Sequence, residues 1–309
     1  ALKKAHVGIS LLSCSGSGPN GQPAKDMMDQ APIVRLGDAS IASPFTYKGD
    51  SIRCCMSILR CGRATLSTVL MMYKIMGLNS VLSAFAMSVL TLDGVKLGDG
   101  QTAVESLLNS MCFFMLSRSA PAKDLAKQRP TGSVFAWHVL LSLALQLVVH
   151  MFTLLSCWQL ANAYRPAGYK RDLEGDFEPN LTNTVVFLVL SAMHASSFMA
   201  NYEGHPFMQP MSANKPLFYS LCFFVASIFL IGSEAIPDIN SSLSLVEFPS
   251  AEFRRHVLGL LALDIGLSVS LSAVVGAVAV RTGASAAEAR AAEWGLGPPA
   301  GADRGKKSK

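Results

Sequence analysis

Charged side chains are scarce in this sequence of 309 residues. Only 15% of the residues are Asp, Glu, Lys or Arg, against roughly 25% in a typical soluble domain, and 50% are hydrophobic. No charged residue occurs between Lys74 and Asp93, and several other stretches exceed the roughly 18 uncharged residues that indicate a membrane helix. This shortage of charge excludes an ordinary soluble domain and predicts a mainly α-helical, multi-span protein whose first partner is the lipid bilayer.

Paired cysteines are also missing. The seven cysteines form no C-x-x-C pair and most lie in predicted helices, so we expect reduced thiols and no metal site. The formal net charge of +5 does not indicate a nucleic-acid partner, because the lysines and arginines lie in loops and tails beside the apolar runs. We expect no cleavable signal peptide at the start of this sequence.

The first 50 residues differ from the rest. Residues 7–12 and 32–36 are short apolar runs typical of buried strands, and the segment 13–30 between them has the Ser, Gly and Pro content of a surface loop. Two short strands cannot bury their own faces. We therefore expect this segment to complete a sheet whose other strands lie outside the sequence.

Six membrane helices are predicted. Residues 51–92 form one proline-free run in which a polar stalk leads into an apolar first span at about 62–92. We expect this helix to start in water and to continue into the bilayer. The other spans are predicted at 102–118, 134–162, 181–201, 216–236 and 254–280. A disordered cytosolic tail is predicted at 281–309, which is rich in Ala, Gly and Pro and has no apolar face.

The distribution of basic residues predicts that both ends lie in the cytosol. Six spans return the chain to its starting side, and the loop 118–133 and the tail are rich in Lys and Arg. The opposite loops, 163–180 and 237–253, are acidic or Ser-rich, and the second contains a sequon with Asn240 as a glycosylation candidate. The final lysines, Lys306 and Lys307, resemble a dilysine retrieval signal, or form a basic end held near anionic lipid.

Polar side chains at bilayer depth are candidates for a transport path, because each is unfavourable in lipid by a few kcal/mol and usually has a use. Asp264 in the sixth span is the clearest carboxylate, and Glu105 is predicted at the mouth of the second span. Asn79, Asn109 and Gln146 supply amides. The alternative for each is a hydrogen bond between helices that serves packing alone.

A pump for a divalent cation needs several oxygens at one point, usually with two or three carboxylates. The interior of the first two spans offers only the amides of Asn79 and Asn109, which leave a double charge uncompensated. His150 and His194 have no metal-ligand spacing and are interpreted as packing residues. The composition therefore argues against a calcium-type site and leaves room for a largely apolar substrate.

Three sequence runs resemble a known family. They are LGDASIASPFT followed by ILRCGRATL at the start of the first helix, FMANYEGHPFMQPMSANKPL at 198–217, and LLALD at 260–264. They are similar to the membrane half of P-type ATPases, most of all to the type V, subgroup A branch of the endoplasmic reticulum. The resemblance implies that residues 1–50 end an α/β, HAD-like phosphorylation domain and that a six-helix membrane bundle follows.

The resemblance also implies a function. Such enzymes hydrolyse ATP with Mg²⁺ through an aspartyl phosphate and extract mistargeted or tail-anchored transmembrane helices from the endoplasmic reticulum membrane. The Asp-Lys-Thr-Gly-Thr run that carries the phosphorylated aspartate and the Gly-Asp-Gly-Thr-Asn-Asp run near the magnesium are absent. We therefore expect no catalytic residue and no ATPase activity in this chain alone.

Two alternatives to a helix dislocase stay open at the level of the sequence. The first is a pump of the same superfamily for manganese or another cation, whose ion-dependent dephosphorylation would be lost in Asp264→Asn. The second is a six-span membrane scaffold that does not couple to ATP.

Overall fold

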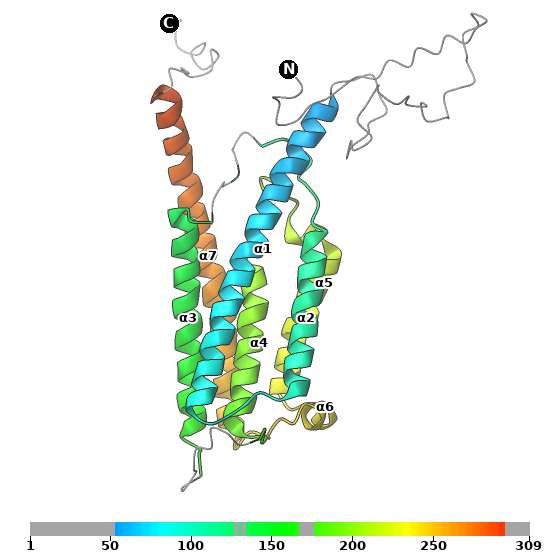
Figure 1. The fold of residues 1–309 in the computed structure, drawn as a ribbon, viewed down its shortest axis with the longest axis vertical. Helices are drawn as coiled ribbons and strands as arrows, with labels where there is room; N and C mark the ends of the chain where they lie inside the picture. The colour runs from blue at the N-terminus through cyan, green and yellow to red at the C-terminus, as the bar shows by residue number, and fades with distance from the viewer. Residues whose placement is uncertain (1–52, 127–129, 131–133, 167–175, 294–309) are drawn as a thin grey trace, which may run out of the picture. The chain divides into compact units, whose positions relative to one another are not determined.

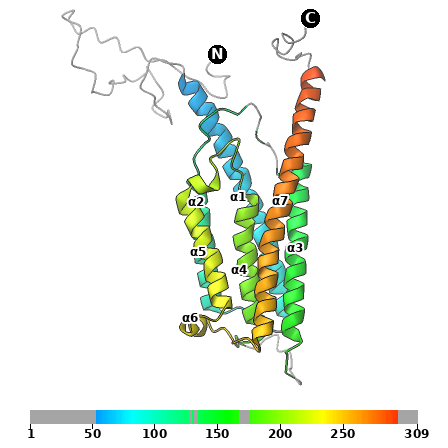
Figure 2. The same ribbon diagram turned by 180° about the vertical axis from the view of Figure 1, so that it is seen from behind.

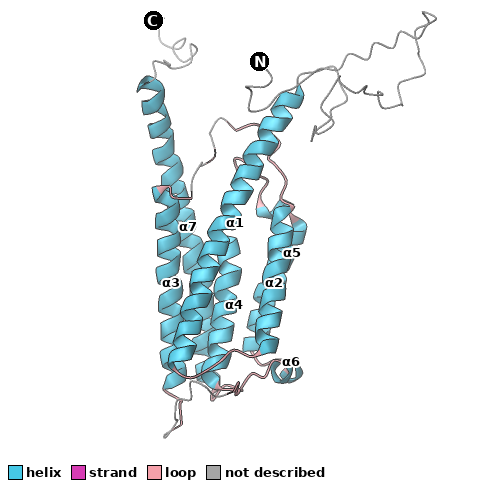
Figure 3. Cartoon of the chain, in the orientation of Figure 1, coloured by secondary structure: helices cyan, strands magenta, loops and turns pink. Residues whose placement is uncertain are grey.

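The described part of the chain is helical (Figures 1 and 3). The computed structural model describes residues 53–126, 130, 134–166 and 176–293. The expected phosphorylation-domain segment and the terminal Lys306 and Lys307 lie outside these residues. Residues 60–293 belong to one compact unit, and of the other unit only the first residues of the first helix are described.

Seven α-helices and one short 3₁₀ turn make up the described residues. They are α1 (Arg53–Leu92), α2 (Asp99–Ser117), α3 (Trp137–Asn162), α4 (Leu181–Asn201), η2 (Met211–Ala213), α5 (Lys215–Gly232), α6 (Pro237–Ser242) and α7 (Ala251–Glu293).

Five helices are long and apolar enough to cross a membrane: α1, α3, α4, α5 and the Ala251–Ala279 part of α7. α2 does not reach the same apolar character, because its first half contains Asp99, Gln101, Thr102 and Glu105. The mainly helical membrane class is therefore confirmed. The second predicted span, 102–118, corresponds to α2 of the bundle, but its composition alone does not mark it as membrane-crossing.

The end of the chain differs from the sequence-based expectation. α7 continues to Glu293, so residues 281–293 are helical where we expected a disordered tail to begin. The run TGASAAEARAAE accounts for the difference, because it is rich in alanine and contains no proline. α5 ends at Gly232, before the predicted 236, since Glu234 adopts φ 59° and Pro237 then starts α6.

α4 lies at the centre of the bundle. It has α3 and α7 on one side and α2 and α5 on the other, and both views agree on this order (Figures 1 and 2). Nearly all of its side chains are buried, as expected for a helix that has no charged residue on any face. Asn180 caps its start, where the side-chain oxygen accepts a hydrogen bond from the Asn183 amide at 2.7 Å.

α1 lies along this bundle and buries one face against it. The buried side chains Met71, Ile75, Leu82 and Ala86 follow a helical period and join the common core. Within residues 60–293, α1 enters the bundle at the same end at which α7 leaves it (Figure 1). A chain that starts and ends on the same side crosses an even number of times. The five apolar helices give an odd number, so α2 must be counted as a sixth crossing.

The α4–α5 loop, residues 202–214, contacts the middle part of α1. Lys74 of α1 is largely buried and pairs with Glu203 of this loop. Thr68 lies against Met208 with an Oγ1–Sδ distance of 3.2 Å. Burial raises the pKa of the Tyr202 phenol, whose hydroxyl donates to the Gln209 carbonyl at 2.8 Å and so stabilises the loop internally.

The α2–α3 loop packs against the same region. The Ala122 amide donates to the Phe207 carbonyl at 3.0 Å, and the Gln209 amide donates to the Ala120 carbonyl at 3.1 Å. Arg60 of α1 donates to the Lys123 carbonyl at 2.7 Å. Two loops from different parts of the chain therefore hold the polar part of α1.

Candidate functional site

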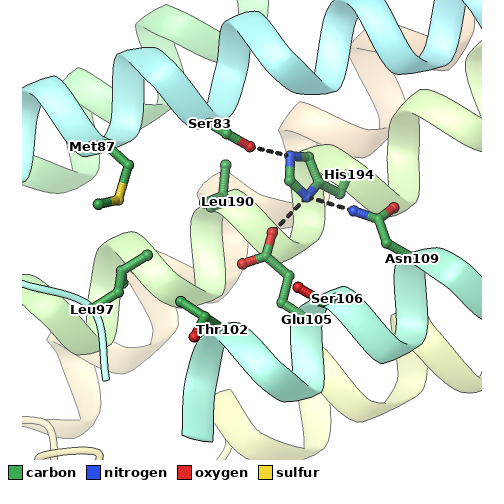
Figure 4. A pocket seen from close by; sticks show the side chains of 9 residues that line it. All are labelled: Ser83, Met87, Leu97, Thr102, Glu105, Ser106, Asn109, Leu190 and His194. Atoms are coloured by element: carbon green, nitrogen blue, oxygen red, sulfur yellow. Dashed lines mark hydrogen bonds and ion pairs between the residues drawn. The ribbon is translucent and has the colours of Figure 1, made fainter. Parts of the chain in front are cut away.

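A cavity of about 230 Å³ lies between α1, α2 and α4 (Figure 4). Its lining combines apolar walls with polar groups: Ser83, Met87, Leu97, Thr102, Glu105, Ser106, Asn109, Leu190 and His194. The exposed side chains Met87, Thr102 and Ser106 form its rim, whereas Glu105 and His194 are buried. The cavity is thus reached from the surface and has a polar, desolvated interior.

His194 of α4 joins three helices at this cavity. Its Nδ1 atom lies 2.5 Å from Glu105 Oε1 and 3.1 Å from Asn109 Nδ2, both on α2. Its Nε2 atom lies 3.2 Å from the Ser83 hydroxyl on α1, and Figure 4 shows the three contacts. Because Nδ1 has a single bonding position, a contact of 2.5 Å with a carboxylate requires that Nδ1 donate to Glu105.

The two amides of the cluster follow from this assignment. Asn79 Nδ2 lies 3.5 Å from Asn109 Oδ1, and the buried Asn79 Oδ1 has no hydrogen-bond partner. When both amides turn by 180°, Asn109 presents its oxygen to the His194 N–H and its nitrogen to the oxygen of Asn79. This second orientation removes the contact between two donors at His194 Nδ1 and gives Asn79 Oδ1 a hydrogen-bond donor.

A second polar network holds α2 against α4 next to the cavity. Gln101 and Asn183, both fully buried, exchange side-chain hydrogen bonds of 2.8 and 3.0 Å. Gln101 Nε2 also donates to the Leu243 carbonyl at 3.0 Å, and Asn183 Nδ2 donates to the Lys96 carbonyl at 2.7 Å. Gln101 precedes Glu105 by one helical turn, so this network fixes the position of the Glu105 carboxylate.

The other predicted path residues lie in a different seam, between α3, α4 and α7. Both oxygens of Asp264 lie 2.9 Å from His150 Nδ1, and both side chains are almost completely buried. Gln146 exchanges hydrogen bonds with Asn201 of α4, the shorter at 2.8 Å. The structure thus brings Asn79, Glu105 and Asn109 together and places Gln146 and Asp264 outside this cluster.

His194 is the site residue that sequence reasoning missed. It was interpreted as a packing histidine, but it contacts all three elements of the cavity. The signal was present in the sequence, because His194 is the only ionisable side chain in the otherwise uncharged helix Leu181–Asn201.

Glu105 was predicted at the mouth of the second span. It is 7% exposed and lies in the second turn of α2, with its carboxylate turned toward α4.

The chemistry available to the cavity follows from its donors and acceptors. Glu105 supplies one negative charge, and Ser83, Ser106 and the Asn109 amide supply neutral oxygens. No group of three or more His, Cys, Asp or Glu side chains gathers anywhere in the described residues. This set suits a single positive charge better than a doubly charged ion, which is usually bound by two or three carboxylates.

The glycosylation candidate Asn240 lies in α6. Its Nδ2 atom donates to the Ile231 carbonyl at 3.2 Å, and its Oδ1 atom is buried without a partner. The side-chain amide nitrogen to which a glycan would be attached is thus engaged inside the fold.

Comparisons with known proteins give related sequences but no matching family model. The endoplasmic reticulum transmembrane helix translocase spfA of Aspergillus fumigatus is 37% identical over 235 residues, 76% of this chain and 18% of the relative. The probable manganese-transporting ATPase PDR2 of Arabidopsis thaliana is 42% identical over 221 residues, 71% of this chain and 18% of the relative. The human polyamine-transporting ATPase 13A2 is 29% identical over 270 residues, 84% of this chain and 22% of the relative.

The chain spans about a fifth of the length of these relatives. The similarity covers most of the chain, and the relatives share one mechanistic superfamily although their names give different substrates. The chain therefore belongs to the type V P-type ATPases and corresponds to their C-terminal part.

Proposed function

We propose that this chain is the C-terminal membrane part of an ATP-driven translocase that extracts transmembrane helices of mistargeted proteins from the endoplasmic reticulum membrane. The similarity to helix translocases over about three quarters of the chain carries this proposal. ATP and Mg²⁺ would be bound by parts of the enzyme outside the sequence, and the clients would be tail-anchored or other single-span proteins.

α1 supports a mechanical role in this function. It runs from Arg53 to Leu92 without a proline or a break, and its polar part is gripped by two loops while its apolar part lines the cavity. A continuous helix transmits a displacement at one end to the other, because its hydrogen bonds resist bending. We propose that ATP-driven movement reaches the cavity along α1.

Energetics limit which clients such an enzyme extracts. Removing a fully apolar helix of about twenty residues from a bilayer costs on the order of 10 kcal/mol, and each central charge lowers that cost by about 3 kcal/mol. Moderately hydrophobic helices, which cost less to remove, are therefore the favoured clients. The acidic Glu105, near the α1–α2 loop, is placed to favour a basic flank.

The test is ATP-dependent extraction. The full-length ATPase that contains this sequence is reconstituted in proteoliposomes together with a fluorescent tail-anchored client, and release of the client is measured. We expect release that requires ATP and falls as the client helix is made more hydrophobic. Equal release with ATP and with a non-hydrolysable analogue would contradict the proposal.

A second candidate function is transport of a manganese-like cation. The convergence of Glu105, His194 and Asn109 favours it, since a carboxylate, an imidazole and an amide are ligands that Mn²⁺ accepts. The name of the Arabidopsis relative agrees with this function.

The variant that separates the two functions is Glu105→Gln. The sequence alone points to Asp264→Asn, but Asp264 is engaged by His150 and lies outside the cavity. Stimulation of ATP hydrolysis by Mn²⁺ that disappears in Glu105→Gln would favour the cation pump. ATP-dependent client release without any stimulation by Mn²⁺ would favour the helix translocase.

A further inference from the structure

We infer that His194 holds the place of a ligand's cationic group in the cavity, and that a primary ammonium on an aliphatic stem displaces it from Glu105. The favoured source of this ammonium is a lysine side chain at the flank of a client helix. This choice of source rests on the proposed function, whereas the displacement itself rests on the geometry of the cavity.

Charge and burial give the first argument. The side chains of Glu105 and His194 are 9% and 4% exposed. A carboxylate at such a site is strongly destabilised unless a donor or an opposite charge lies beside it. Among the residues that line the cavity, His194 is the only one with a basic side chain. The imidazole therefore supplies the hydrogen-bond donor that the buried Glu105 carboxylate needs.

The shape of the cavity gives the second argument. Met87, Leu97 and Leu190 form apolar walls that suit a chain of methylene groups. An ammonium has three N–H donors, which match the carboxylate of Glu105, the side-chain oxygen of Asn109 and a hydroxyl oxygen. A neutral imidazole on α4 has a single N–H donor to share among these acceptors.

The position of His194 gives displacement a mechanical consequence. The imidazole bonds to Ser83 of α1 through one nitrogen and to Glu105 of α2 through the other. A ligand that takes over Glu105 removes one of the polar contacts by which α4 holds α2. It also leaves His194 free to change its contact with α1, the helix that leads out of the cavity toward the polar loops.

The experiment measures binding in the chain reconstituted in lipid nanodiscs. The probes are a synthetic transmembrane peptide with one flanking lysine, its norleucine counterpart, and free spermidine as a second source of primary ammonium. We expect a preference of at least about tenfold for the lysine peptide over the norleucine peptide. His194→Gln, which removes the competing imidazole, is expected to raise this preference, and Glu105→Gln is expected to abolish it.

His150→Gln is the matched control, because it removes an equally buried histidine that pairs with a carboxylate outside the cavity. It should leave the lysine preference unchanged. Competition by spermidine with no lysine preference would assign the site to a free polyamine and keep the displacement. Absence of both lysine preference and spermidine competition would overturn the inference, as would a preference that survives in Glu105→Gln.

A measurement on the unmodified chain covers the case in which a variant does not fold. Nitrogen NMR of ¹⁵N-labelled histidine follows the two buried imidazoles directly. Saturation with the lysine peptide should shift the His194 signals and leave those of His150 in place. Unchanged His194 signals at saturation would refute the displacement. Neither experiment uses ATP, so failure of ATP-driven extraction would refute the proposed function without touching this result.

Discussion

His150 and Asp264 form a pair from which water is excluded, with side-chain exposures of 0% and 1%. Removing one partner leaves the other buried without a counter-group, and such changes typically cost about 3 to 5 kcal/mol. We therefore predict that His150→Leu lowers the free energy of unfolding of the chain by about 3 kcal/mol. Unfolding in mixed micelles, followed by circular dichroism, measures this loss.

The double variant His150→Leu, Asp264→Leu is the control for this prediction. Because it removes both polar groups together, it should recover most of the stability that the single variant loses. A double variant that is less stable than His150→Leu would indicate that the pair stabilises the fold by more than satisfying the hydrogen-bonding groups of its two members.

At the scale of residues, the sequence predicts which polar side chains are buried in the bundle better than it predicts which of them are in contact. Asp264 is expected from the sequence to be an intramembrane carboxylate, and it is buried accordingly, yet its partner His150 lies 114 positions away. Glu105 and His194 are likewise far apart in the sequence and come together only through the packing of α2 on α4. Spacing along the chain contains no information about such contacts.

Gly232 offers a prediction at the scale of helices. A Cβ atom added there would lie 2.8 Å from Leu258 Cδ2 on α7 and 3.6 Å from Leu188 Cδ1 on α4. Gly232→Val therefore requires that the Leu258 side chain shift, and it is predicted to lower the free energy of unfolding by about 1 kcal/mol. The same micelle titration measures it.

Gly266 provides the comparison, because nothing lies within 4 Å of a Cβ atom added there. Gly266→Val should change the free energy of unfolding by less than about 0.5 kcal/mol. Equal losses in the two variants would mean that β-branching in a helix, and not the contact with Leu258, determines the effect.

Helix positions could be predicted because a long uncharged run in a chain this apolar almost always forms a membrane helix. The fourth span was expected at 181–201, and α4 occupies Leu181–Asn201. The misjudged boundary is that of α7, where a lack of apolar residues was equated with a lack of helix. Alanine-rich, charged segments form helices without an apolar face, so hydropathy detects the end of the membrane span and not the end of the helix.

At the scale of the whole chain, the number of crossings depends on α2. Two of its polar residues face inward, where Gln101 bonds to Asn183 and Glu105 bonds to His194. Its outward residues include Leu107 and Phe114, both more than half exposed. A helix with buried polar groups and exposed apolar groups has the pattern of a membrane span in a bundle, although its average hydropathy is low.

Labelling of single cysteines in sealed microsomes tests whether α2 crosses the membrane. Lys96 and Ala120 are exposed and lie just beyond the two ends of α2. In a background without the native exposed cysteines, Ala120→Cys should react with a membrane-impermeant maleimide added outside, because the positive-inside rule places the α2–α3 loop in the cytosol. Lys96→Cys should react only after the microsomes are permeabilised. Reaction of both positions from one side would exclude six spans.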